Sequence, residues 1–408
     1  MQGPLDAFRR LLRSDASLHA ALGEIDLPDV FIARAVDLAQ AAGLAISRDD
    51  IAGALRPDPL GLLRPQDLND DPAWPPPGWL PVSLAPGLDG RNVVEWIYFG
   101  GTALDQPFFD MSARQARIRP FNRLCCWRQD LDSFIAGAPE LEPETAPQGL
   151  VFHMSRCGST LVAQMLAASP RNVVLSEAPP IDAALRLGEL HPGADETLLR
   201  RALLAMTAAL GRGRGRAAQG DSRLFLKLDS WHTLALPLFR AAFPQTPWVF
   251  LYRNPVEVLV SQMRARGMQT VPGMLPAALQ GADGADSGPG DAAIGGEDFC
   301  ARVLATGCAA TLAHFPLGGG LLVNYDELPL ALFTKILPHF GVRPEAAEID
   351  AMRAATQRDA KAPYMPFAQD GDDKRRAATT AAQAAAERHL APIYAALEAM
   401  RADAAALA

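Results

Sequence analysis

Two short groups of residues have the types and spacing needed to bind anions. The first is S-R-C-G-S-T at residues 155–160, which places one cation, small residues and hydroxyls between an apolar run and a segment that favours a helix. A tight turn from a strand into a helix directs several backbone N–H groups to one point, at the positive end of the helix. This group is therefore expected to cradle a phosphate.

The cradle differs from a Walker A loop. No Lys precedes the Ser159-Thr160 pair, and no Gly lies five residues before Gly158. The cation is Arg156, two residues before the glycine. An Arg side chain stays protonated and can hold two phosphate or sulfate oxygens at once. An ordinary strand-to-helix turn is the plainer interpretation of the same residues.

The second group is R-N-P-V-E-V-L-V-S at residues 253–261, which follows the apolar run 248–252. Pro255 suits the first turn of a helix, so the preceding strand is expected to end there. Arg253 would then lie at the carboxyl end of a strand, and Ser261 on the following helix. By itself the group is also compatible with a turn and a solvated Arg.

In this order, the two groups resemble the nucleotide motifs of sulfotransferases that use 3′-phosphoadenosine 5′-phosphosulfate. The loop R-x-G-[ST]-T is similar to their 5′-phosphosulfate loop, and R-[DN]-P-x-[DE]-x-x-x-S to their 3′-phosphate motif. Y-D-E-L at 325–328 is similar to a third segment, Y-E-D-L. The resemblance covers roughly residues 148–345. It implies a donor site made of Arg156, Cys157, Gly158, Ser159, Thr160, Arg253, Ser261 and Tyr325.

The resemblance also implies catalytic roles, and it is closest to the tyrosylprotein and bacterial branch. Glu177 follows Arg156 by 21 residues, in the place of that branch's general base. Lys227 and Arg156 would stabilise charge around the transferred group. Asp229 and His232 stay open as alternative bases, and a helix-capping role is the alternative for Glu177.

One family feature is missing. The late Gly-rich loop R-K-G-x-x-G-x-W does not occur in this sequence. Residues 361–366 and the run Lys374, Arg375 and Arg376 lie in roughly the right region to close over the 3′-phosphate. The second clamp on the nucleotide therefore stays unassigned.

The chemistry implied by the resemblance needs no metal, because a sulfuryl group carries less charge than a phosphoryl group. The only expected cofactor is the co-substrate 3′-phosphoadenosine 5′-phosphosulfate. The sequence agrees, since its seven His residues are scattered and Cys125 and Cys126 are adjacent rather than in C-x-x-C spacing.

The elements that must position these residues form an alternating pattern. Strands are expected at about 150–154, 173–177, 224–228, 248–252 and 321–325, with helices between them. This predicts an α/β fold with a central parallel sheet and helices on both faces, the P-loop-like sulfotransferase fold, preceded by a helical appendage. The expected domains are residues 1–55 (small helices), 56–145 (a Pro-rich linker and an aromatic-rich segment) and 146–408 (the sulfotransferase domain).

The amino-terminal helices carry a second, short resemblance, to the nitrogen-fixation-associated leader-like domain. A generic helical appendage is the alternative. The residues that carry this resemblance are Phe8, Asp15, Leu18, Leu22, Phe31, Ala39, Gly43 and Ile46.

Composition indicates the cellular compartment and excludes some classes of partner. Five Cys residues and the lack of an apolar signal segment favour a cytoplasmic protein with reduced thiols. No run of ~18 uncharged apolar residues, the length that a membrane span needs, occurs in the sequence. The net charge of −8 argues against broad nucleic-acid binding.

The predicted activity is transfer of a sulfuryl group to a hydroxyl or amine of a small-molecule or peptide acceptor. The alternatives are a P-loop small-molecule kinase and a non-catalytic partner-binding protein with a degenerate nucleotide site. The acceptor and the oligomeric state stay open.

Overall fold

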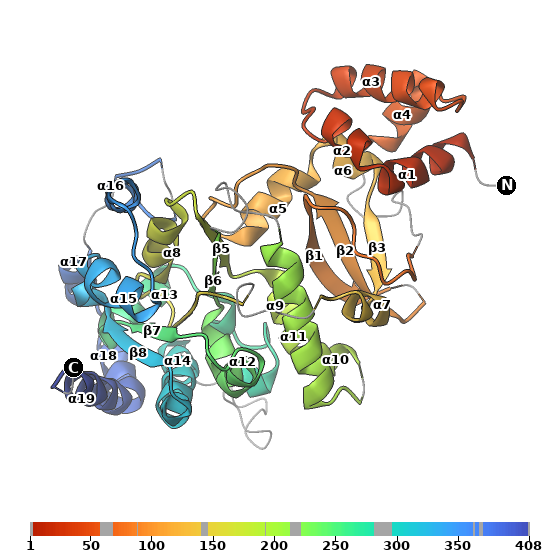
Figure 1. The fold of residues 1–408 in the computed structure, drawn as a ribbon. Helices are drawn as coiled ribbons and strands as arrows, with labels where there is room; N and C mark the ends of the chain where they lie inside the picture. Colours follow the sequence, from red (N-terminus) through yellow and green to blue (C-terminus); the bar gives the residue numbers. More distant parts are fainter. Residues whose placement is uncertain are drawn as a thin grey trace. The chain divides into compact units, whose positions relative to one another are not determined.

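The computed structural model describes residues 3–57, 68–87, 89–139, 146–191, 193–212, 222–280, 296–361, 364–366 and 370–406. The chain divides into two compact units, and Figure 1 labels their elements. Unit 1 consists of Met1–Thr145 and Ala178–Gly220, and unit 2 of Ala146–Glu177 and Asp221–Ala408.

Unit 1 is built on an antiparallel sheet with the strand order β1-β2-β3. The strands are β1 (Trp79–Pro86), β2 (Asn92–Tyr98) and β3 (Trp127–Asp130). The expected amino-terminal helices are present, and Phe8 and Leu12 of the first are buried as its apolar spacing predicts. The helices before and around this sheet are α1 (Pro4–Ser14), α2 (Ala16–Leu22), α3 (Pro28–Ala41), α4 (Arg48–Ala54), α5 (Phe109–Arg117), α6 (Pro120–Leu124) and α7 (Leu131–Ala136).

Three later helices complete unit 1. They are α9 (Pro179–Leu185), α10 (Leu187–Leu190) and α11 (Glu196–Gly211). Both α9 and α11 contact β1, and α11 also contacts α7. The sequence predicts that residues 178–220 belong to the sulfotransferase domain, 146–408. They group instead with the amino-terminal unit, because the apolar sides of α9 and α11 are buried against its sheet and helices.

Unit 2 is an α/β layer structure around five parallel strands, which confirms the predicted fold class. Each strand begins and ends within one residue of its predicted position. The strands are β4 (Gly149–His153), β5 (Asn172–Ser176), β6 (Arg223–Lys227), β7 (Trp248–Tyr252) and β8 (Gly320–Asn324).

The strand order is β5-β6-β4-β7-β8, with all strands parallel. The connections leave β4 and β7 toward opposite sides of the sheet. After β4 the chain crosses toward β5, whereas after β7 it proceeds to β8 on the other side. Right-handed crossovers in opposite directions place their helices on opposite faces of the sheet. Every residue of β4 and β7 is buried, as expected for strands covered on both faces. The carboxyl ends of β4 and β7 thus form the switch point at which such sheets bind ligands.

The helices of unit 2 complete the layers, with α16 against α8 and α19 against β8 (Figure 1). The α-helices are α8 (Ser159–Ala167), α12 (Leu236–Ala242), α13 (Pro255–Arg264), α14 (Gly296–His314), α15 (Leu337–His339), α16 (Ala346–Ala355), α17 (Gly371–Arg376), α18 (Thr380–Ala385) and α19 (Ala391–Ala406). Short 3₁₀ or π segments are η2 (Ser230–Ala235), η3 (Met268–Thr270), η4 (Ala277–Gln280), η6 (Phe315–Leu317), η7 (Tyr325–Glu327), η8 (Leu332–Ile336) and η9 (Ala386–Leu390).

Candidate functional site

The loop between β4 and α8 has an unusual backbone. Ser155, Arg156 and Gly158 have φ angles of 76°, 54° and 85°. Left-handed conformations cost a non-glycine residue of order 1–3 kcal/mol and persist only where the surroundings enforce them. Glu177, after β5, has a φ of 49°. Within the described ranges, Ser155, Arg156 and Glu177 are the only non-glycine residues with positive φ. All three lie at the edge of the sheet where the carboxyl ends of β4 and β5 are found.

Two buried side chains hold this loop in place. The Nδ1 atom of His153 accepts the N–H of Ser155 at 3.0 Å, and its Nε2 atom lies 2.8 Å from the carbonyl oxygen of Leu228. These partners assign the proton to Nε2. From α13, Gln262 donates to the Ser155 hydroxyl at 3.0 Å. The sequence motifs include neither His153 nor Gln262, and the only signal for them is their position beside motif residues.

Arg156 is half-buried and anchored to the end of α13. It donates to the carbonyl oxygen of Ala265, which caps that helix. A helix carboxyl terminus carries partial negative charge and favours a cation. Burial lowers the pKa of Arg156, but a guanidinium stays protonated at neutral pH. This is its one hydrogen bond within the described residues, so other N–H groups can reach an anion.

Helix α8 begins with the hydroxyl residues of the predicted cradle. Ser159 and Thr160 are its first residues and are buried, and no described side chain caps its amino terminus at Gly158. The free N–H groups of such a terminus bind anions. Cys157 differs from the other loop residues, because its thiol donates to the carbonyl oxygen of Leu251 at 3.1 Å and burial raises its pKa to about 11. Its side chain packs in the interior, so only its backbone N–H could face a ligand.

An ion pair joins the ends of β5 and β6. The ammonium of Lys227 contacts Oε1 of Glu177, and the Nε2 atom of His153 lies 3.5 Å from the same oxygen. The backbone N–H of Glu177 donates to the carbonyl oxygen of Lys227 at 2.7 Å, which extends the strand pairing by one residue. The Lys227 side chain is 1% exposed, whereas 26% of the Glu177 side chain is exposed. Two of the predicted catalytic residues are thus in direct contact.

The charges of this cluster are set by its surroundings. Burial acts to raise the pKa of Glu177, but the Lys227 ammonium and then His153 outweigh it, so this pKa lies well below its usual range. Burial, followed by the positive charge of Lys227, lowers the pKa of His153. At neutral pH the cluster therefore contains a carboxylate and a neutral imidazole.

Arg253 is held in the interior by contacts on two sides. It is 4% exposed, and its guanidinium pairs with Oε2 of Glu257 at 2.6 Å. Its Nη2 atom also lies 3.3 Å from Oδ1 of Asp370. The guanidinium carbon lies 3.8 Å from the centroid of the Tyr325 ring, a cation–π stacking distance.

Tyr325 connects the two predicted anion-binding motifs. One contact of its ring is with Arg253. The ring also lies so close to Gly158 that an added Cβ would come within 2.9 Å of it. The first loop and the second motif therefore meet at one aromatic side chain. This juxtaposition lies at the switch point between β4 and β7.

Ser261 lies on α13, eight residues after Arg253, and is half-buried. The pairing of Arg253 with Glu257, one helical turn before Ser261, directs the Arg253 side chain along this helix. Within the described residues, no hydrogen bond joins Ser261 to Arg253. Their common ligand stays a prediction.

Asp229 and His232, the alternative bases, contact each other. The Asp229 side chain caps η2, and its backbone N–H donates to Nδ1 of His232 at 3.2 Å. Both side chains are buried. This reciprocal cap gives each a structural role at the carboxyl end of β6.

The two basic segments predicted to close over the 3′-phosphate lie in different surroundings. Lys374 pairs with Asp370 at 2.8 Å, beside Arg253. Lys361 is instead influenced by Arg156 and Lys227. Loss of water around its ammonium, and then these two cations, lower its pKa to about 8. The structure thus associates Lys374 with the second motif and Lys361 with the first.

A cavity of about 640 Å³ adjoins the second motif. It has room for a nucleotide-sized ligand. Its walls come from α8, α13, η7, the end of α16 and α17, and include Leu161, Glu257, Tyr325, Leu328, Gly371 and Arg375.

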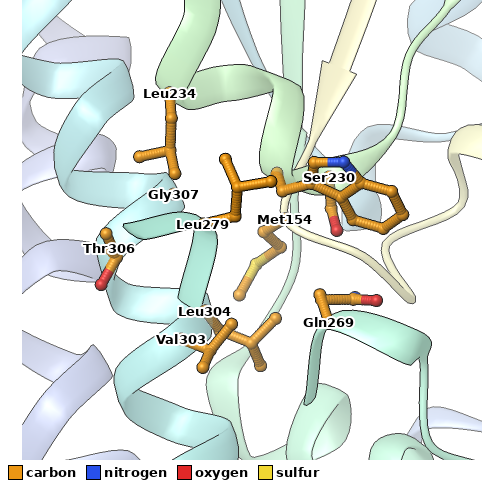
Figure 2. Close-up of a pocket in the computed structure, with 10 residues that line it drawn as sticks. Met154, Ser230, Leu234, Gln269, Leu279, Val303, Leu304, Thr306 and Gly307 are labelled. Atoms are coloured by element: carbon orange, nitrogen blue, oxygen red, sulfur yellow. The ribbon is translucent and has the colours of Figure 1, made fainter. Parts of the chain in front are cut away.

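A second, smaller pocket lies at the ends of β4 and β6. In Figure 2, Met154 lies between Leu279 on one side and Val303 and Leu304 on the other. The pocket holds about 20 Å³, which is room for a single water molecule. In this conformation it is too small for an acceptor.

The fold was compared with known proteins. No protein-family model and no curated protein matches the sequence. The solved structures that resemble parts of this chain include sulfotransferases. The sulfotransferase domain of an olefin synthase from Synechococcus PCC 7002 is 17% identical, with a TM-score of 0.35, over 62% of this chain and 90% of that one.

Two further structures give similar values. Sulfotransferase STF9 from Mycobacterium avium is 14% identical, with a TM-score of 0.33, over 52% of this chain and 69% of that one. A sulfotransferase from Alicyclobacillus acidocaldarius is 13% identical, with a TM-score of 0.32, over 63% of this chain and 96% of that one.

The leader-like resemblance of residues 1–55 gains no support from these comparisons and stays a prediction. No helix in the described ranges is long and apolar enough to cross a membrane.

Proposed function

We propose that unit 2 transfers a sulfuryl group from 3′-phosphoadenosine 5′-phosphosulfate to a hydroxyl or amine of an acceptor. The observation that carries the proposal is the contact of Tyr325 with both Gly158 and Arg253. It supports one ligand that spans two anion sites on neighbouring strands. The proposed donor has such groups, a phosphosulfate at the 5′ position and a separate phosphate at the 3′ position.

The residues of the first loop would hold the phosphosulfate. The uncapped amino terminus of α8 offers N–H groups, and the hydroxyls of Ser159 and Thr160 lie beside them. Arg156 and Lys227 supply positive charge near the bond that breaks. Because sulfuryl transfer passes through a loose, in-line transition state, positioning and neutralisation of charge account for most of the expected catalysis.

The reaction moves one proton and one sulfuryl group. The acceptor hydroxyl gives its proton to the Glu177 carboxylate, and its oxygen forms a bond to sulfur. The bond from sulfur to the bridging oxygen breaks, and its electron pair leaves with 3′-phosphoadenosine 5′-phosphate. Lys227 is the last residue of β6, at the same edge of the sheet as the first loop, and would stabilise the charge that develops on this leaving oxygen.

The ion pair implies that Lys227 exchanges partners during the reaction. While Lys227 contacts Glu177, the pKa of that carboxyl is too low for an effective base. When the ammonium turns to the phosphosulfate, Glu177 loses its closest positive charge and its pKa rises. Binding of the donor would thus prepare the base for the acceptor.

Calorimetry with 3′-phosphoadenosine 5′-phosphate, adenosine 5′-phosphate and ATP tests the proposal. We expect the bisphosphate to bind most tightly, and Glu177→Gln to keep this binding while it abolishes turnover. Glu345→Gln is a matched control, because Glu345 pairs with Arg171 at the surface. Preferred binding of ATP would support the kinase alternative instead. Binding of none of the three, or full activity of Glu177→Gln, would contradict the assignment.

A further inference from the structure

Two buried cations of unit 2 converge on one exposed carboxylate. Asp370, the residue before α17, contacts Arg253 at 3.3 Å through Oδ1 and Lys374 at 2.8 Å through Oδ2. Arg253 and Lys374 are 4% and 6% exposed, whereas 44% of the Asp370 side chain is exposed. Together they form a built anion site in which the anion belongs to the chain itself.

The other carboxylate on Arg253 differs from Asp370 in burial. Glu257 is 2% exposed and pairs with both Arg253 and Arg375. It lies on α13, four residues after Arg253, so its position is fixed by the helix. Asp370 contacts Nη2 of the same guanidinium at 3.3 Å, farther away than Glu257, and its side chain reaches solvent. Of the two carboxylates, Asp370 is therefore the one that a ligand can replace.

Lys374 requires an anion beside it, because Asp370 is its one ion-pair partner within the described residues, whereas Arg253 also pairs with Glu257. A buried ammonium or guanidinium without a counter-charge costs several kcal/mol. Burial lowers the pKa of Lys374, the hydrogen bond to Asp370 raises it, and the nearby charge of Arg253 lowers it again. The pKa of Lys374 therefore lies below its ordinary value. Some anion must therefore stay at this position whether or not a nucleotide is bound.

The cavity beside this cluster gives a ligand access to it. Gly371, the neighbour of Asp370, lines the cavity, as do Glu257 and Tyr325, which hold Arg253. A nucleotide in the cavity would bring a phosphate to the guanidinium of Arg253. At that point it meets the carboxylate of Asp370.

We propose that Asp370 is an internal counter-anion, which holds Arg253 and Lys374 in the free protein and gives way to the 3′-phosphate of the nucleotide. This inference rests on the proposed function. It assigns Lys374 as the second cation for the 3′-phosphate, in a sequence that lacks the family's late Gly-rich loop. In each binding event the 3′-phosphate then replaces the carboxylate of Asp370. The 3′-phosphate must therefore compete with Asp370 for Arg253 and Lys374.

The test compares two carboxylate variants and two ligands in the full chain. Asp370→Asn should tighten binding of 3′-phosphoadenosine 5′-phosphate by about tenfold, equivalent to about 1.4 kcal/mol. Its binding of adenosine 5′-phosphate, which lacks the 3′-phosphate, should change by less than about twofold. Asp298→Asn is the matched control, because the Asp298 side chain is 32% exposed and pairs with Arg388 rather than with Arg253. It should leave both affinities unchanged.

The reciprocal variant covers the case in which Asp370→Asn does not fold. Lys374→Gln should weaken the bisphosphate by about tenfold and leave adenosine 5′-phosphate unaffected. Unchanged or weaker bisphosphate binding in Asp370→Asn would show that Asp370 is a permanent structural partner and would overturn the inference alone. If the wild-type chain binds no bisphosphate, the proposed function fails, and the inference fails with it.

Discussion

Glu177→Gln should destabilise unit 2 more than Lys227→Met, although both remove the same ion pair. The reason is unequal burial, since the Lys227 side chain is 1% exposed and that of Glu177 26%. Glu177→Gln removes the carboxylate of this pair from beside an ammonium in the interior, at a cost of about 3–5 kcal/mol. Lys227→Met leaves a carboxylate that can reach water, and should cost about 1–2 kcal/mol.

Differential scanning calorimetry measures this difference as the change in Tm of each variant relative to the wild type. At about 2–4 °C per kcal/mol for a unit of this size, Glu177→Gln should lower Tm by about 6–20 °C and Lys227→Met by about 2–8 °C. The double variant Glu177→Gln/Lys227→Met should be more stable than Glu177→Gln alone, because it also removes the buried ammonium. A larger loss in Lys227→Met, or additive losses in the double variant, would refute the argument from burial.

The pH dependence of this stabilisation has a definite sign. The pKa of Glu177 is lower in the folded than in the unfolded chain, so the folded state favours the carboxylate. The contribution is complete above the unfolded value, about 4.3, and is lost as the pH falls toward the folded value. The Tm difference between wild type and Glu177→Gln should thus be constant from about pH 5.5 to 8 and shrink only in acid.

Three other variants test the nucleotide site by calorimetry with the bisphosphate. Gly158→Ala should weaken binding of the bisphosphate by about tenfold, because the added Cβ would lie 2.9 Å from Tyr325 at a residue with a φ of +85°. Gly307→Ala is the control, and equal losses of affinity in the two variants would contradict this prediction. Arg253→Lys should weaken the bisphosphate by about tenfold but spare adenosine 5′-phosphate; equal losses would exclude the 3′-phosphate role. Affinity should fall as the pH rises through about 8, where Lys361 loses its charge; Lys361→Met should abolish this dependence, and an unaltered profile would disprove it.

The sequence predicts the strands of unit 2 well because each contains a short run of apolar residues, chiefly Leu, Val and aromatic residues, between turn residues. It also identifies Arg156, Glu177, Lys227 and Arg253. The order of the strands is a long-range property, so the switch point that brings β4 and β7 together could not be derived from periodicity.

The residues that the sequence misses act through contacts distant in the chain. Gln262 holds Ser155 across 107 positions, and Asp370 contacts Arg253 across 117. Asp370 lies in no recognisable motif. A carboxylate beside a predicted phosphate site also contradicts the simple expectation that only cations gather there. Such partners become visible only when the fold is known.

The sequence also gives no sign that residues 178–220 pack with the amino-terminal unit. Their helical pattern is equally compatible with either unit, because amphipathic helices differ little in the surface they can cover. The observed contacts of α9 and α11 with β1 decide between the two.

This interleaving has a consequence for synthesis on the ribosome. Unit 1 lacks α9 and α11 until residue 211 has been made, by which time β4, α8 and β5 of unit 2 have already emerged. The amino-terminal sheet must therefore wait, with one side incomplete, while the first segment of the other unit, Ala146–Glu177, is released. Proteins whose domains are contiguous can fold them one after another during translation. Here the two units must mature together, and a truncated chain that begins at residue 146 would retain α9 and α11 without the sheet that buries them.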